Sequence, residues 1–178
     1  MKYLALIFAA ALAACTGKPS FQDASLSDRA LNLEEFFDGQ FKAYGQFQDV
    51  LGTVRRQFVV DIAGTWDGEE LRLVEDFVYE DGSTEQRIWT LRKTGPVQAD
   101  QTWEGTAPGV IGVAKGREQG DRFNWRYTID LPVGEGETTR VTFDDWMWLQ
   151  SEDRLLNKAY MKRFGLDVGD VIITFEKL

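Results

Sequence analysis

Residues 122–131 read RFNWRYTIDL, a strict alternation of polar and apolar side chains. Successive side chains of a β-strand point to opposite faces of the sheet, so this period of two predicts a strand with one buried face and one solvated face. The apolar positions are Phe123, Trp125, Tyr127, Ile129 and Leu131.

The same pattern recurs along the chain between short turns. Asp81-Gly82 is a strong signal for a two-residue hairpin, and looser glycine-containing turns occur at 64–68, 120–121 and 134–136. Strands at this spacing predict an antiparallel meander rather than βαβ units. The expected strands are 37–48, 54–63, 69–80, 84–93, 101–106, 110–118, 122–132, 138–150 and 170–177.

Two further segments complete the expected fold. Residues 154–164 favour helix by propensity, whereas their length and flanking turns fit one more hairpin strand, which we favour. Residues 31–36 are compatible with a short turn of helix that caps the strands after it. A sheet of nine or ten strands must close to bury its apolar face and its edges. The sequence therefore predicts an all-β fold, an antiparallel meander closed into a barrel with at most one short helix.

The N-terminus carries a separate signal. Met1-Lys2 is followed by an apolar run that ends in Leu12-Ala13-Ala14-Cys15, and Cys15 is the only cysteine. A charged start, a short apolar stretch and small residues before a cleavage point are typical of a secretory signal. A cysteine directly after that point resembles the lipobox of bacterial lipoproteins, where the thiol is acylated. The apolar run is shorter than the roughly 20 residues of a membrane-spanning helix.

This signal predicts three parts: a signal peptide at 1–14, a lipidated Cys15 with a polar tether at 15–32, and a barrel domain at 33–178. The resemblance to bacterial lipoproteins implies a Gram-negative envelope with a membrane contact through acyl chains. Thr16 follows Cys15 in place of the aspartate that usually retains lipoproteins at the inner membrane, so we expect anchoring in the outer membrane, facing the periplasm.

The composition of the chain argues against several classes of function. The chain of 178 residues has a formal net charge of −9, which argues against nucleic acid as a partner and against docking on anionic lipid through basic patches. It has no histidine, which excludes Ser-His-Asp and Cys-His catalysis and ordinary zinc sites. We therefore expect no cofactor, no metal site and no enzymatic activity.

Charged residues on otherwise apolar strand faces are candidate ligand contacts. Arg56 lies beside Phe58, Glu75 is in phase with Leu73 and Phe77, Arg87 with Trp89, and Asp145 with Phe143. Inside a closed barrel such charges must pair with each other or meet a polar ligand group, because unpaired buried charge is costly. The alternative, that they are solvated at the barrel rim, stays open. The predicted ligand-binding residues are Arg56, Phe58, Glu75, Arg87, Phe123, Trp125, Tyr127 and Asp145.

The strand at 138–150 is apolar on both faces near its end. The apolar rhythm shifts from Val141 and Phe143 to Trp146 and Trp148, which predicts a β-bulge at Asp144-Asp145. One face then packs in the core, and the other either lies under a neighbouring segment, which we favour, or forms an exposed aromatic patch. With Trp66, which sits in a turn, Trp146 and Trp148 are the candidate contacts for a protein partner.

Four strings carry a resemblance to a known family. They are residues 75–82 (EDFVYEDG), 87–89 (RIW), 144–148 (DDWMW) and 157–165 (NKAYMKRFG). With them, residues 33–178 resemble a bacterial lipoprotein family catalogued as domain of unknown function 3833, which has no assigned activity. More loosely, residues 37–41 (FDGQF) look like the Gly-x-aromatic opening of calycin barrels such as lipocalins.

Two functions are consistent with these observations. The first is a lipid-anchored, non-enzymatic barrel that binds a small apolar or amphipathic molecule. The second is an envelope scaffold or assembly factor that acts through protein contacts on the outside of a filled barrel. A barrel of eight to ten strands is wide enough for either a packed interior or one small ligand, so strand number does not separate them.

Overall fold

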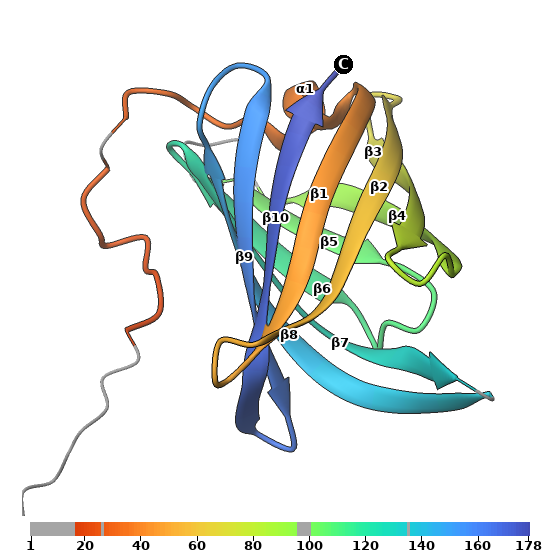
Figure 1. The fold of residues 1–178 in the computed structure, drawn as a ribbon. Coiled ribbons are helices and arrows are strands. Elements are labelled where there is room, and N and C mark those ends of the chain that lie inside the picture. The colour runs from red at the N-terminus through yellow and green to blue at the C-terminus, as the bar shows by residue number, and fades with distance from the viewer. Residues whose placement is uncertain (1–16, 26, 96–100, 135) are drawn as a thin grey trace, which may run out of the picture.

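A computed structural model describes residues 17–25, 27–95, 101–134 and 136–178. The chain forms a closed antiparallel barrel of ten strands in which each strand pairs with its neighbours in sequence and β1 pairs with β10 (Figure 1). The all-β barrel and its short helix are confirmed. The strands are β1 (Gly39–Asp49), β2 (Val54–Trp66), β3 (Glu70–Tyr79), β4 (Thr84–Thr94), β5 (Thr102–Thr106), β6 (Ala114–Gln119), β7 (Arg122–Gly134), β8 (Glu137–Leu149), β9 (Arg154–Arg163) and β10 (Leu166–Lys177).

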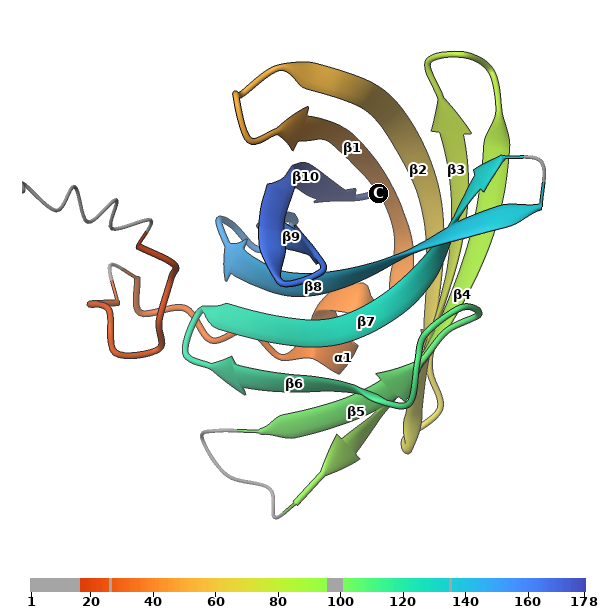
Figure 2. The ribbon, with the colours of Figure 1, turned by 90° about the horizontal axis from the view of Figure 1, so that it is seen from below.

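One end of the barrel is closed by the helix α1 (Leu33–Phe37). Seen from the opposite end, α1 lies behind the ring of strands (Figure 2). The rings of Phe36 and Phe37 pack against Phe41, with centroids 5.4 Å apart in both pairs. The helix is held by Glu118, whose carboxylate accepts a hydrogen bond from the Leu33 backbone N–H at 3.1 Å. We call this the closed end and the other, where the β1–β2 and β9–β10 turns lie, the open end. No helix in the described ranges is long and apolar enough to cross a bilayer.

Residues 154–164, ambiguous by sequence, form strand β9 and the start of its turn. The strand prediction is confirmed because β9 pairs along its length with β8 and β10, and this pairing outweighs the helix propensity of its residues. Asn157 and Ala159 alternate with Lys158 and Tyr160 between the inner and outer faces, and both inner residues are buried.

The bulge predicted at Asp144-Asp145 is wrong. The β7–β8 register runs unbroken from Arg122↔Trp148 to Pro132↔Thr138, and the β8–β9 register is unbroken as well. Val141, Phe143, Asp145 and Met147 keep one inward phase, and Trp146 and Trp148 lie on the outer face. The second apolar run exists because that outer face is covered by another part of the chain.

The cover is the segment before α1, which the sequence assigns to the tether. The Phe21 ring packs on Trp146 with centroids 4.9 Å apart, and Trp146 is buried. The Arg122 guanidinium donates to the backbone carbonyls of Ser20 and Asp23 at 3.0 and 2.9 Å. The described part of the tether therefore lies along the barrel wall, while Cys15 and the signal peptide fall outside the described residues.

Candidate functional site

The barrel encloses a cavity of about 330 Å³ lined by side chains from eight of the ten strands and from α1. Leu33 and Phe37 form its floor at the closed end, and Phe47, Leu131 and Met161 line it towards the open end. Ala159 is one inward position with a small side chain, and it lines the cavity directly. At Gly45 the ring of Phe58 occupies the place of a side chain, since a Cβ there would lie 2.4 Å from it.

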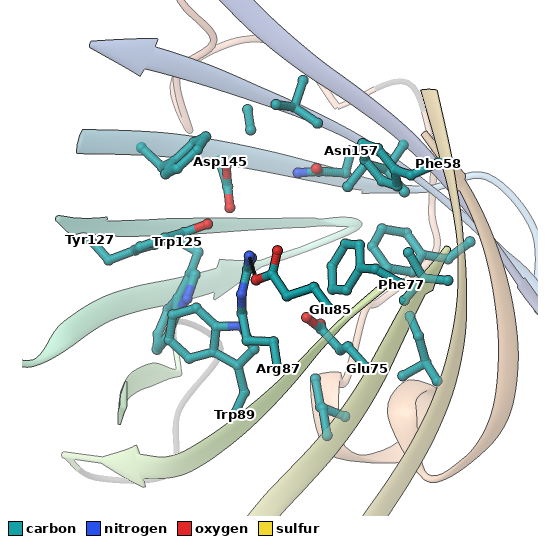
Figure 3. A pocket seen from close by; sticks show the side chains of 18 of the residues that line it. Phe58, Glu75, Phe77, Glu85, Arg87, Trp89, Trp125, Tyr127, Asp145 and Asn157 are labelled. Atoms are coloured by element: carbon teal, nitrogen blue, oxygen red, sulfur yellow. Dashed lines mark hydrogen bonds and ion pairs between the residues drawn. The ribbon is translucent and has the colours of Figure 1, made fainter. Parts of the chain in front are cut away.

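Eleven of the 30 residues that line the cavity are aromatic, and several of their rings are seen in Figure 3. Trp89 on β4 packs edge-to-face against Trp125 and Tyr127 on β7, with centroids 5.7 and 5.0 Å apart. On the opposite side Phe58 and Phe77 lie 5.6 Å apart. Such rings offer a large, rigid apolar surface to a bound molecule.

A polar cluster interrupts this apolar wall. The Arg87 guanidinium donates to Glu85 at 2.6 Å, and the Tyr79 hydroxyl donates to the other Glu85 oxygen at 2.8 Å. Burial tends to raise the pKa of Glu85, but Arg87 and the Tyr79 hydroxyl together lower it below its usual value. Burial likewise opposes the charge of Arg87, and Glu75 with the other nearby groups raises its pKa above the usual range. Arg87 and Glu85 thus form an ion pair inside the barrel.

Two further carboxyl groups of the described chain face the cavity without an ion-pair partner at close range. Asp145 points from β8 towards Tyr127 and Arg87, and Glu75 lies beside Arg87 and Glu85 (Figure 3). Burial raises the pKa of Asp145 to about 8, more than the Tyr127 hydroxyl and Arg87 lower it, and raises the pKa of Glu75 to about 7, more than Arg87 lowers it. The Oδ1 atom of Asp145 is buried and has no hydrogen-bond partner among the described residues. A protonated carboxyl both donates and accepts hydrogen bonds, so these groups can bind either an acceptor or a donor group of a ligand.

The eight residues predicted from sequence as ligand contacts all line this cavity. Arg56 is at its edge, where its guanidinium carbon lies 3.4 Å from the centroid of the Tyr79 ring and its side chain is partly solvated. The structure thus brings the charges on apolar faces together inside the barrel, with Arg56 nearest to solvent. Their contact with a ligand stays a prediction.

Sequence reasoning missed three residues of the cluster, namely Tyr79, Glu85 and Asn157. Glu85 shares the inward phase of Arg87 and Trp89, so the alternation within β4 was sufficient to find it. Asn157 was hidden by the ambiguity of residues 154–164; it lies inside the barrel, where its amide donates to the Trp146 carbonyl at 3.1 Å. Among the described residues no group of three or more acidic, cysteine or histidine side chains is arranged to hold a metal ion.

The three tryptophans predicted as partner contacts lie outside the cavity. Trp146 is covered by Phe21, and Trp148 stacks beside it with centroids 6.3 Å apart and is half-buried. Trp66 is half-buried near the closed end, 6.1 Å from Trp103. The covered arrangement that the sequence favoured for the Trp146 face is the one observed. A role in partner binding stays a prediction.

Comparison with known proteins decides the family. The sequence profile described as "Protein of unknown function (DUF3833)" matches residues 9–177. The chain belongs to this family. No curated protein matches the chain. Among solved structures it is similar to the S-type phycobiliprotein lyase CPES from Guillardia theta, at 13% identity and a TM-score of 0.61, over 83% of this chain and 93% of the other. At this identity the similarity shows a shared fold. It confirms the resemblance to calycin barrels as a resemblance of fold.

Proposed function

We propose that the barrel binds one small molecule with an apolar body and a polar group capable of hydrogen bonding. The observation that carries the proposal is the cavity of about 330 Å³ inside the barrel, with aromatic rings in its wall and an Asp145 oxygen that has no hydrogen-bond partner among the described residues. A pocket that is mostly apolar with a few convergent polar groups is the usual form of a small-molecule site. A barrel of similar fold occurs in a protein named as a phycobiliprotein lyase, which is consistent with this proposal.

The first test is native mass spectrometry of the full chain isolated from its own host cells. We expect an added mass that is released on denaturation. Ala159→Phe should abolish it, because Ala159 lines the cavity and the added ring occupies the space of the ligand. The matched control is Ala63→Phe on the outer phase of β2. A clean mass for the wild-type chain from its host, together with no binding of apolar fluorescent probes, contradicts the proposal.

A second candidate, acid–base catalysis on the bound molecule, is favoured by one observation. Glu75 and Asp145 have pKa values raised to about 7 and 8 by burial, near the range in which a carboxyl transfers protons at neutral pH. Structural burial raises carboxyl pKa values in the same way, so we propose binding as the function and catalysis as its alternative. A comparison of the molecules extracted from the wild type and from Asp145→Asn distinguishes binding from catalysis. Identical molecules support a carrier, and a chemical difference between them supports catalysis.

The envelope location is a further proposal, which rests on Leu12-Ala13-Ala14-Cys15. We expect a mature chain that begins at acylated Cys15 and resides in the outer membrane. Mass spectrometry of the N-terminal peptide and fractionation of the membranes test both points. Cys15→Ser should remove the acyl chains, and an unmodified Cys15 in the wild-type chain would contradict the proposal.

The scaffold function stays an alternative for the outer wall. It predicts crosslinking to a specific envelope protein that is lost in Trp148→Ala while stability is kept. Trp146 contributes to such a surface only when the segment around Phe21 leaves the wall, since that segment covers it.

A further inference from the structure

Two turns at the open end expose large apolar side chains to solvent. Leu51, with Val50, lies at the β1–β2 turn, and Phe164, with Leu166, lies at the β9–β10 turn; Leu51 and Phe164 are 85% and 87% exposed. The two turns are neighbours because β1 and β10 are hydrogen-bonded as far as Asp49↔Gly169. We call Val50, Leu51, Phe164 and Leu166 the apolar rim.

The backbone at Phe164 indicates that its exposure is not accidental. Phe164 and Gly165 form a two-residue turn with φ angles of 51° and 78°. Such turns favour Asn or Gly, because a bulky side chain at positive φ is sterically costly. Phe164 bears this cost while its ring is 87% exposed, which favours a contact with a surface outside the barrel.

The N-terminal segment runs down beside the barrel from α1 towards the open end (Figure 1). Lys18 forms an ion pair with Asp167 at 3.4 Å, and its ammonium lies 5.0 Å from the centroid of the Tyr160 ring. Cys15, the predicted acylation site, is three residues earlier, and three residues of chain reach at most about 11 Å. The predicted acylation site is therefore, along the chain, within three residues of a contact with β10.

The side chains near the apolar rim carry more positive charge than the chain as a whole. Arg55 and Arg163 are exposed there, and the Arg163 guanidinium lies 5.1 Å from the centroid of the Phe164 ring. Lys18 and Lys162 lie beside Asp167, and Arg55 is paired with Asp49. Four cations thus face two carboxylates in a chain whose net charge is −9. Cations around exposed apolar side chains are typical of a protein surface that lies at a bilayer interface.

We propose that the apolar rim inserts into the headgroup region of a phospholipid bilayer and turns the open end of the barrel towards the membrane. Phe47, Met161 and Val171 line the cavity within a few residues of the two turns. The mouth of the cavity then faces lipid, and an apolar ligand passes between bilayer and barrel without crossing water. Membrane docking of the rim stands independently of ligand binding; the direction of ligand exchange rests on the proposed function.

Site-specific photocrosslinking tests the orientation in the full chain. A photoreactive benzoylphenylalanine replaces Phe164 in one variant and Asp153 in the other, and each protein is reconstituted in vesicles of phosphatidylethanolamine and phosphatidylglycerol. Asp153 is the matched control because it lies in an exposed turn at the closed end. We expect lipid adducts at position 164 in at least about tenfold excess over position 153, as expected for one apolar side chain buried in lipid.

A second pair of variants separates apolar insertion from simple proximity. Leu51→Asp in the background of the position-164 crosslinker should lower the lipid adduct about tenfold, and Leu178→Asp should not. Leu178 is 77% exposed at the closed end, so the two changes are alike in side chain and exposure. Neither position packs in the core, so both variants should fold.

Each other outcome overturns the proposal. Equal adducts at positions 164 and 153 mean that the barrel has no fixed orientation. Adducts at twice the mass of the chain mean that the rim contacts a second copy instead of lipid. No effect of Leu51→Asp means that the turn near it lies outside the bilayer. Native mass spectrometry measures ligand retention separately, so a failure of docking is distinguishable from a failure of ligand binding.

Discussion

Arg87 and Glu85, two residues apart on β4, form an ion pair inside the barrel with an N–O distance of 2.6 Å. Neighbours at this spacing share a face, so a single strand supplies both charges to the cavity. The pair lies among aromatic rings and beside Glu75, and it fixes the polar side of the site. Its energetics can be measured directly.

Arg87→Met should destabilise the fold by about 3 kcal/mol, because it leaves the largely buried Glu85 carboxylate without its cation. Urea unfolding measures the change. The double variant Arg87→Met, Glu85→Leu removes both charges and should recover most of the loss. A double variant less stable than Arg87→Met would contradict this account of the pair.

Stability should fall as pH rises from about 5 to 9. The pKa of Asp145 is about 8 in the folded state and near its usual value of 3.8 in the unfolded state, so between these values the folded chain holds a proton that the unfolded chain has lost. The stabilisation is complete below the unfolded pKa and is lost as pH rises through the folded pKa. Glu75 and Glu118, with pKa values raised to about 7 by burial, act in the same direction.

Asp145→Asn should flatten this pH profile and raise stability at pH 9 relative to wild type by a few kcal/mol, because burial disfavours the ionised carboxyl. Thermal unfolding from pH 5 to 9 provides the measurement. Asp76→Asn, on the exposed face of β3, is the control and should leave the slope unchanged. An unchanged slope in Asp145→Asn would show that its carboxyl is ionised in the folded state.

Loss of the contact between Phe21 and Trp146 should release the N-terminal segment. Phe21→Ala should cost about 1 kcal/mol and speed proteolysis within residues 17–31, because the ring that covers Trp146 is gone. Trp146→Ala, at a buried position, should cost about 3 kcal/mol. Equal proteolysis of the wild type and Phe21→Ala would mean that other contacts, such as those of Arg122 and Lys18, hold the segment.

Gly64→Ala should displace the floor of the cavity. A Cβ at Gly64 would lie 1.7 Å from the Phe37 carbonyl oxygen, so the backbone of α1 must move. We expect a loss of about 2 kcal/mol on unfolding in urea and faster hydrogen exchange in residues 33–37. The control Gly17→Ala meets nothing within 4 Å and should be neutral. Unchanged exchange in α1 would show that the helix is not seated on β2.

The alternation of side chains was enough to predict most of the strands and the eight cavity residues. It worked because a closed barrel has one interior, so every inward position faces the same space. The expected strand 37–48 begins one residue inside α1, and the expected strand 110–118 begins four residues before β6. The same rule failed at Asp144-Asp145, where two apolar faces were interpreted as a slip in phase. The sequence shows that Trp146 and Trp148 need cover, but only contacts between distant parts of the chain show that Phe21 provides it.

The sequence by itself determined a closed antiparallel barrel, because period-two patterning and turn residues are local properties of the chain. Tertiary structure alone decided that the interior is hollow, that Glu85 neutralises Arg87 there, and that one oxygen of Asp145 is left without a hydrogen-bond partner in the described chain. It also decided that Leu51 and Phe164, 113 positions apart in sequence, lie on neighbouring turns at the open end. These outcomes depend on the volume left between packed side chains and on which distant strands become neighbours, and neither is encoded in the pattern of a single segment.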